Sequence, residues 1–157
     1  YAEGDAIIAK STKEKKVLAC PTGDCPIMLV SNVDGDFVSI IHCGWQSIAQ
    51  NIIPKTFHIL IGPYNIEEFR IGLFPGICPG CYEVDPDIGE GYFKDYILPT
   101  NKLDLKKVIV DQCLDAGIQN IEIFHYCSAH EVNGTDYLYH SYRRDKAEER
   151  NLVFTVI

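Results

Sequence analysis

The strongest constraint on the fold is a pair of apolar segments, residues 24–30 and 36–41, separated by the dipeptide Asp34-Gly35. An Asp-Gly dipeptide between two such segments is typical of the tight turn that joins antiparallel strands. Both segments are short and rich in Ile and Val, which favours strands over helices. We therefore expect a β-hairpin that brings Cys25, near the start of its first strand, to the same end as His42, which follows its second strand.

A thiol and an imidazole side by side suit two kinds of chemistry. Together they bind zinc, or they act as a nucleophile and its general base. On the residues alone, an inert buried thiol and a hydrogen-bonded core histidine are equally good interpretations. A zinc site needs at least one more ligand. The sequence offers these candidates for it: Cys20, Cys43, His58, His125 and Cys127.

The rest of the chain combines strands with a few helices. Apolar runs at 5–9 and 16–20 predict two further strands, and from residue 46 the apolar spacing becomes helical, with Pro54 expected to kink or end that helix. The later predicted elements are a strand at 69–74, a short helix at 85–96, a helix from 101 or 102 to 116 with Gly117 as its C-cap, a strand at 118–126 and a closing strand at 152–157. This order favours the α+β class. We expect the strands 16–20, 25–31 and 36–42 to be adjacent, with helix 102–116 in an outer layer.

Length and charge narrow the class of protein. A chain of 157 residues is most simply one domain spanning 1–157, and its net charge of −8 argues against nucleic acid or an anionic membrane as the main partner. No apolar run reaches the roughly 18 residues that span a bilayer. The odd number of cysteines, seven, favours reduced thiols and a cytoplasmic location. The sequence does not indicate an oligomeric state.

The motif Cys78-Pro-Gly-Cys81 has the spacing of a redox pair or of half a zinc site. A redox pair usually opens a helix, whereas this one lies among prolines and glycines. A structural zinc site needs a second pair at similar spacing, and we identify none in the sequence. We therefore expect a tight turn near the Cys25 site.

Two adjacent arginines, Arg143 and Arg144, lie in a segment expected to be a loop. Adjacent guanidinium groups bind phosphate or carboxylate well. The alternative is a solvated turn in which the arginines pair with Asp145, Glu148 and Glu149, and on the residues alone this alternative is favoured.

Five motifs of this sequence resemble those of one protein family and occur in the same order. They are Asp24-Cys-Pro-Ile27, His42-Cys-Gly-Trp45, the loop Pro75–Val84, Cys127-Ser128 and Ser141-Tyr-Arg-Arg-Asp145. A sixth feature is Leu103-Asp-Leu105 before the helix that ends at Ala116-Gly117. This set resembles the YfiH-type family, also called the multicopper polyphenol oxidoreductase or laccase-domain family.

The resemblance implies a four-layer αββα sandwich with mixed sheets. It also implies a single zinc ion held by two histidines and one cysteine, with copper less expected, and Cys25 and His42 match two of these ligands. The third ligand of the family is a histidine in a Val-His-Gly motif upstream of the region that matches Gly4-Asp5, and this sequence contains no such motif there. We therefore interpret the chain as a divergent or N-terminally shortened member.

The family resemblance further implies a zinc-dependent purine nucleoside phosphorylase or adenosine deaminase, with a purine nucleoside and phosphate as its small-molecule partners. In this interpretation Cys25 and His42 are both metal ligands and catalytic residues, and Asp24 moves a proton or orients His42. The residues predicted to contact substrate are Arg143, Arg144, Cys127 and Tyr82.

Three alternatives remain at this point. One is a metal-free thiol hydrolase or deamidase with Cys25 as nucleophile and His42 as base. Another is a catalytically inactive binding domain, which the missing third ligand and Gln46, where the family has arginine, both favour. The last is a copper-dependent polyphenol oxidoreductase, which is disfavoured because the sequence shows no set of His and Cys for several copper ions.

Overall fold

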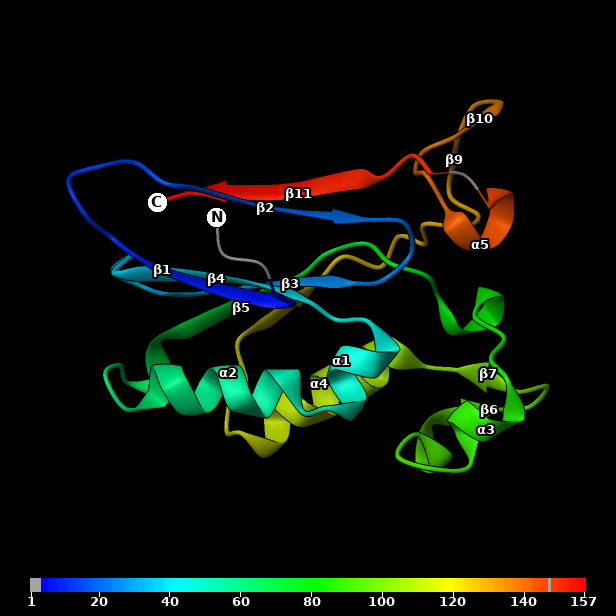
Figure 1. Ribbon diagram of the computed structural model, residues 1–157, viewed down its shortest axis with the longest axis horizontal. Coiled ribbons are helices and arrows are strands. Elements are labelled where there is room, and N and C mark those ends of the chain that lie inside the picture. The colour runs from blue at the N-terminus through cyan, green and yellow to red at the C-terminus, as the bar shows by residue number, and fades with distance from the viewer. Residues whose placement is uncertain (1–3, 147) are drawn as a thin grey trace.

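The centre of the fold is a five-stranded sheet (Figure 1) in a computed structural model that describes residues 4–146 and 148–157. Its strand order is β1-β4-β3-β5-β8. The bounds are β1 Ala6–Lys10, β3 Ile27–Asn32, β4 Phe37–His42, β5 Phe69–Leu73 and β8 Ile121–Ile123. Neighbouring strands are antiparallel except β5 and β8, which are parallel. The parallel pair brings the segments that follow β5 and β8 to the same edge of the sheet.

The predicted hairpin is confirmed as β3 and β4, and its register pairs Ile27 with His42. The main-chain N–H of Cys43 donates to Pro26 O at 2.9 Å and extends the pairing beyond the strands. The two thiol- and imidazole-bearing segments therefore meet at one end of the hairpin, as the sequence predicts.

Strand β4 is buried along almost its whole length because both of its faces are covered. Phe37 and Ile41 pack into one core cluster, whereas Val38 and Ile40 pack into a second. The first cluster lies against a layer of helices that includes α1 (Trp45–Ala49), α2 (Ile52–Ile61) and α4 (Leu105–Asp115). The second lies under a two-stranded ribbon of β2 (Val17–Thr22) and β11 (Asn151–Val156). Figure 1 shows the helices below the sheet and the ribbon above it.

The α+β prediction is confirmed, with one strand placed differently. Segment 16–20 was expected beside the hairpin, but β2 pairs with the closing strand β11 and covers the sheet from above. The reason is that β1, from earlier in the chain, takes the position beside β4. Within residues 4–146 and 148–157 a helical layer covers one side only, so three of the four predicted layers are present.

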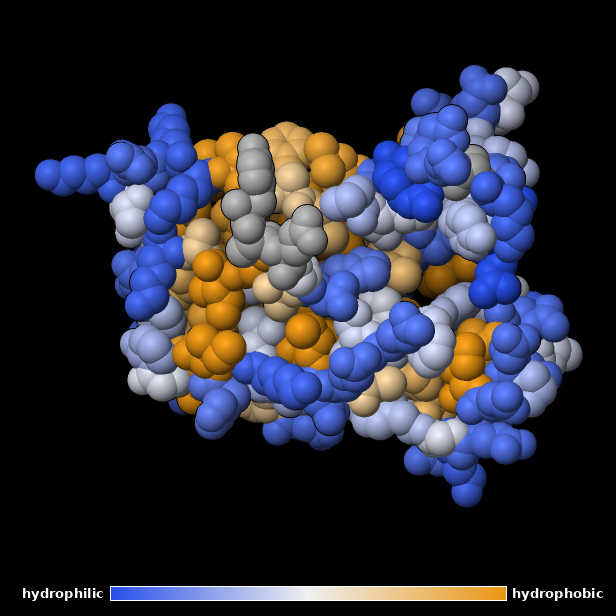
Figure 2. Space-filling model, viewed as in Figure 1, coloured by the Kyte–Doolittle hydropathy of each residue, from blue (hydrophilic) through white to orange (hydrophobic). Residues whose placement is uncertain are grey.

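The outer face of the β2–β11 ribbon is apolar and exposed. It carries Val17, Leu152, Phe154 and Val156, each more than half exposed. Figure 2 shows this patch as an orange area over the ribbon. Alternation along β11 explains it, because the remaining side chains of the strand turn toward the sheet.

The helices differ from their predicted bounds for local reasons. The helix expected from residue 46 is broken at Asn51, which has a left-handed φ of 61°, and Pro54 lies in the first turn of α2, where its missing N–H has little cost. Helix α4 begins at Leu105 rather than 101 or 102, because the Asp104 side chain caps it by accepting from the Lys107 N–H. Gly117, with a φ of 88°, follows α4 as predicted.

Short elements make up the rest of the described chain. They are η1 Ile66–Glu68, η2 Pro79–Cys81, α3 Pro86–Gly89, η3 Lys94–Tyr96, β6 Ile97–Leu98, β7 Lys102–Leu103, β9 Val132–Asn133, β10 Asp136–Tyr137 and α5 Tyr142–Asp145. The strand predicted over 118–126 is reduced to the three residues of β8, since only these pair with β5. None of the helices in the described ranges is long and apolar enough to cross a membrane.

Candidate active site and a second cysteine cluster

A cavity of about 440 Å³ lies between the segment that joins β2 to β3, the end of β4 and helix α5. Five of the predicted site residues line it: Asp24, Cys25, His42, Tyr82 and Arg143. A larger cavity of about 570 Å³ lies between the sheet and the end of β11, but no thiol or imidazole lines it. Of these two cavities, only the smaller one is lined by a thiol and an imidazole.

Cys25 and His42 face the same space, and Gly44 leaves that space open. A Cβ atom placed on Gly44 would lie 3.1 Å from His42 Cε1 and 3.5 Å from Cys25 Sγ. A sulfur and an imidazole nitrogen are ligands that suit zinc, so this part of the site fits the ion. In the part of the chain that the structure describes, no third Cys, His or carboxylate converges with them.

The His42 ring is held by Asp5, a residue that sequence reasoning missed. Asp5 Oδ1 lies 3.0 Å from His42 Nδ1, and Asp5 Oδ2 accepts from Ser47 Oγ at 2.8 Å. These two hydrogen bonds, with His42 first, lower the pKa of Asp5. Because a carboxylate only accepts, Nδ1 carries the proton, and Nε2 is the nitrogen that can act as a metal ligand in the neutral ring. The signal was the register of β1 against β4, which becomes visible only when the two strands are paired.

Asp24 was predicted to move a proton or to orient His42, and the structure gives it different neighbours. Its carboxylate accepts from Ser128 Oγ and Ser141 Oγ, both at 2.7 Å, and from the Arg143 main-chain N–H at 2.6 Å. Asp24 thus connects the start of β3 to two segments more than 100 residues away. It fixes the wall of the cavity on which Arg143 lies.

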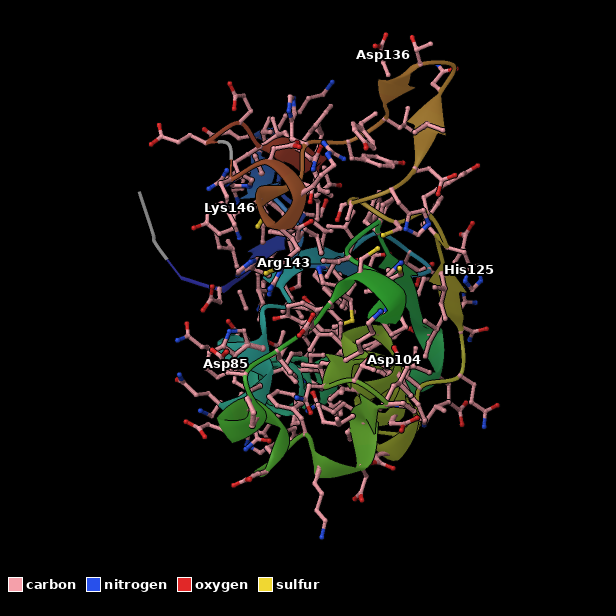
Figure 3. All side chains as sticks on the ribbon, turned by 90° about the vertical axis from the view of Figure 1, so that its right-hand side faces the viewer. Asp85, Asp104, His125, Asp136, Arg143 and Lys146 are labelled. Atoms are coloured by element: carbon pink, nitrogen blue, oxygen red, sulfur yellow. The ribbon has the colours of Figure 1, made fainter. Side chains whose placement is uncertain are left out.

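The two adjacent arginines have separate surroundings. Arg143 lines the cavity, and its guanidinium carbon lies 5.4 Å from the centre of the Tyr82 ring. In Figure 3 it lies on the inner side of α5, whereas Asp136 lies out at the tip of the β9–β10 hairpin. Arg144 is not among the cavity-lining residues. For Arg144 the alternative of a paired turn is the better description, because it donates to Asp145 and to three main-chain carbonyls.

Burial controls the protonation of the two weak acids in the cavity. It raises the pKa of the Cys25 thiol to about 11, with smaller contributions from the negative charges of Asp24 and Asp5. Burial likewise raises the pKa of Tyr82 to about 12. A thiol of this kind is protonated at neutral pH unless a cation stabilises its thiolate. This weighs against the alternative of Cys25 as a metal-free nucleophile.

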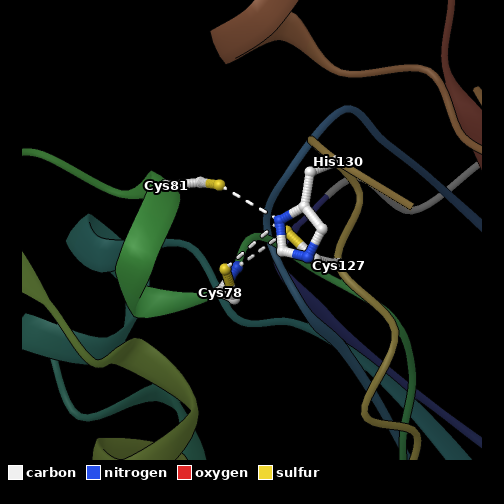
Figure 4. Close-up of side chains that lie close together, drawn as sticks. All are labelled: Cys78, Cys81, Cys127 and His130. Atoms are coloured by element: carbon white, nitrogen blue, oxygen red, sulfur yellow. Dashed lines mark hydrogen bonds between the residues drawn. The ribbon is translucent and has the colours of Figure 1, made fainter. Parts of the chain in front are cut away.

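A second cluster, which we call the Cys3His cluster, consists of Cys78, Cys81, Cys127 and His130. Figure 4 shows the four side chains converging from two segments, and their donor atoms lie within 4.8 Å of one another. Cys127 was predicted to contact substrate, but it lies in this cluster and not among the residues that line the cavity.

The Cys3His cluster also corrects the interpretation of Cys78-Pro-Gly-Cys81 as a turn without a second pair. Residues 79–81 do form a tight turn, η2. The missing second pair is Cys127 and His130, whose spacing is the same as that of Cys78 and Cys81. This pair was missed because Cys127 was assigned to the Cys25 site or to substrate contact, and His130 was not considered.

The sequence is also similar to those of known proteins. A sequence model described as "Multi-copper polyphenol oxidoreductase laccase" matches residues 1–156. The chain belongs to this family. Among the described residues of this laccase-family chain, the four of the Cys3His cluster are the one set of three or more potential metal ligands that converge.

Proteins with similar sequences include two that are named purine nucleoside phosphorylase. The one from Aquifex aeolicus is 31% identical over 159 residues, which cover 99% of this chain and 71% of the relative. The one from Campylobacter jejuni is 30% identical, with 88% of this chain and 62% of the relative covered. The YfiH protein of Bacillus licheniformis, a solved structure, has a TM-score of 0.79 at 22% identity and covers 97% of this chain and 60% of its own. The fold is therefore that of YfiH-type proteins, and this chain spans between three fifths and three quarters of the length of these proteins.

Proposed function

We propose that the cavity beside Cys25 and His42 binds a purine nucleoside and cleaves its glycosidic bond with phosphate. The observation that carries this proposal is the convergence of Cys25, the Asp5-held His42 and Arg143 on one cavity. Membership of the laccase family and the names of its two phosphorylase relatives support the choice of substrate.

The reaction we propose needs an anion site and a polar environment for the leaving base. A phosphate oxygen forms a bond to C1′ of the ribose, the bond from C1′ to N9 breaks, and its electron pair leaves with the purine, which takes up a proton. Arg143 supplies the positive charge for phosphate, and its main-chain bond to Asp24 fixes its position. Tyr82 keeps its proton at neutral pH and so offers a hydrogen-bond donor in the same cavity.

The proposal includes zinc, held by Cys25 and by Nε2 of His42. When bound, zinc supplies a Lewis acid that polarises an oxygen or nitrogen of the substrate. Asp5 keeps the imidazole in the tautomer that presents Nε2. Adenosine deamination is the second reaction we propose for the cavity, because it takes the same nucleoside.

Measurement of three reaction products tests the proposal. The protein is incubated with inosine or adenosine, with and without phosphate, and free base, ribose 1-phosphate and ammonia are measured. We expect release of the base to depend on phosphate. We expect ammonia to form from adenosine but not from inosine. Base release that does not depend on phosphate, or no turnover of either nucleoside, would contradict the phosphorylase assignment.

Matched variants then test the residues. We expect His42→Gln to abolish turnover and His58→Gln to leave it unchanged, because His58 lies exposed on α2 and away from the cavity. We expect Cys25→Ser to abolish turnover while the protein stays folded. If His42→Gln keeps full activity, the cavity is not the site of the reaction.

A further inference from the structure

We propose that the Cys3His cluster is a structural zinc site, separate from the Cys25–His42 cavity, that joins the segment after β5 to the segment after β8. It contains Cys78, Cys81, Cys127 and His130 (Figure 4). Its role is to hold together two walls of the cavity.

The topology of the sheet brings the two segments together. Strands β5 and β8 are parallel neighbours, so the chain leaves both at the same edge. The pairing continues past the strands as a parallel bridge between Gly76 and Cys127, and the Ser128 N–H donates to Gly76 O at 3.2 Å. Each segment then contributes one pair of ligands with two residues between them, which is the spacing typical of zinc sites.

The distances suit a tetrahedral ion. His130 Nδ1 lies 3.2 Å from Cys81 Sγ and 3.7 Å from Cys78 Sγ. Zinc bonds of about 2.3 Å to sulfur and 2.0–2.1 Å to nitrogen separate tetrahedral donors by roughly 3.5–3.8 Å. The imidazole nitrogen therefore already points at the sulfurs at nearly the separation that zinc imposes.

The donor set identifies both the ion and its role. Three sulfurs and one imidazole favour zinc over the hard cations magnesium and calcium. Four protein ligands leave no open position for substrate, which is the mark of a structural rather than a catalytic site. A redox pair fits less well, because η2 has only three residues and so provides no helix to stabilise the thiolate of Cys78.

Neighbouring groups support negative charge on the sulfurs. The Cys78 main-chain N–H points at Cys127 Sγ, at a distance of 3.3 Å. Lys106 holds its amino group nearby by donating to the carbonyls of Phe124 and Tyr126, at 3.0 and 3.2 Å. Zinc with three thiolates and a neutral imidazole has a net charge of −1, which this lysine offsets.

The position of the cluster links it to the cavity. Tyr82, which lines the cavity, directly follows the ligand Cys81. Ser128, which directly follows the ligand Cys127, donates to Asp24. Zinc in the Cys3His cluster therefore holds the neighbouring residues Tyr82 and Ser128 in position.

Elemental analysis in a Cys25→Ser background tests the site without interference from the cavity. We expect the Cys25→Ser protein, prepared with zinc, to retain one zinc ion per chain and to bind Co²⁺ in its place with the sulfur-to-cobalt charge-transfer absorption of a tetrahedral thiolate site. Adding Cys81→Ser and His130→Ala should remove that ion. Adding Cys20→Ser instead should leave it, because Cys20 lies on β2 and outside the cluster.

Thermal unfolding gives a second readout. A chelator should lower the Tm of the Cys25→Ser protein, and added Zn²⁺ should restore it. The proposal is overturned if the Cys25→Ser protein holds neither zinc nor cobalt, or if the ion survives loss of Cys81 and His130. If the variant without these two ligands does not fold, the cobalt spectrum and the chelator melt of the Cys25→Ser protein decide the question.

Discussion

Arg143 and Arg144 are adjacent, chemically identical and expected to respond to alanine substitution in opposite ways. Arg144→Ala should destabilise the fold and Arg143→Ala should not. The side chain of Arg144 is 17% exposed, and it donates to Ala129 O at 3.1 Å and to Tyr139 O at 3.0 Å. Its guanidinium carbon also lies 3.6 Å from the centre of the Tyr137 ring.

The size of the effect follows from these contacts. Two main-chain hydrogen bonds contribute about 1–1.5 kcal/mol each, and the stacked ring adds about 0.5–1 kcal/mol. We leave the longer bond to Ser128 O and the exposed pair with Asp145 out of the sum. Arg144→Ala should therefore lower the free energy of unfolding by about 2.5–4 kcal/mol, which is about 5–16 °C in Tm for a domain of this size.

Arg143→Ala keeps the main-chain bond to Asp24, so its free energy of unfolding should change by less than about 0.5 kcal/mol. Its effect should instead be on the KM for phosphate, which we expect to rise about 10-fold or more on loss of a charged hydrogen bond. Arg70→Ala, on β5 and outside the proposed site, is the matched control and should leave that KM unchanged.

Chemical denaturation and phosphate titration of the three variants separate the two roles. Equal stability of Arg143→Ala and Arg144→Ala, within about 0.5 kcal/mol, would show that the contacts of Arg144 do not stabilise the fold. An unchanged KM for phosphate in Arg143→Ala would mean that Arg143 does not bind the anion.

Three further predictions concern single contacts. Gly76→Ala should destabilise the protein by about 1–3 kcal/mol in chemical denaturation, because its Cβ would lie 2.7–2.9 Å from Pro26, whereas Gly91→Ala, with no atom within 4 Å, should cost far less; equal costs would refute the argument. Asp24→Asn should cost about 1–3 kcal/mol and raise the KM for phosphate, because the amide nitrogen replaces one carboxylate oxygen and cannot accept, so either the Arg143 N–H or the two serine hydroxyls lose their acceptor; a change in neither quantity would mean that Asp24 does not organise the wall. The bond from Arg144 lowers the pKa of Asp145, so this pair stabilises the protein above the usual carboxyl pKa and less as the pH falls through the lowered value; the Tm difference between wild type and Asp145→Asn should therefore shrink below about pH 4, and a difference that grows there would contradict this sign.

Much of the site end of the fold could be predicted from the sequence because its signals are local. The apolar segments on either side of Asp34-Gly35 define the hairpin, and a hairpin fixes which ends meet. Cys25 and His42 therefore had to lie at one end whatever surrounded them. Gly117 could likewise be assigned as a C-cap, because the left-handed position after a helix depends on a few neighbouring residues.

The second metal-ligand set could not be assembled in the same way. Cys78 and Cys81 show their spacing in the sequence, and so do Cys127 and His130. Nothing local indicates that the two pairs meet, because that contact depends on the parallel pairing of β5 with β8. Non-local pairing of this kind is set by the packing of the whole sheet.

The sequence by itself determined the hairpin, the α+β class and the meeting of Cys25 and His42 at one end of that hairpin. Only the tertiary structure decided the surroundings of each side chain. It placed Asp5 on His42, turned Arg143 toward the cavity and Arg144 toward main-chain carbonyls, and moved Cys127 out of the substrate site into the Cys3His cluster. The physical reason is that side-chain identity and spacing are properties of the chain, whereas the partner of a carboxylate, a guanidinium or a thiol depends on which distant segment the packed sheets bring beside it.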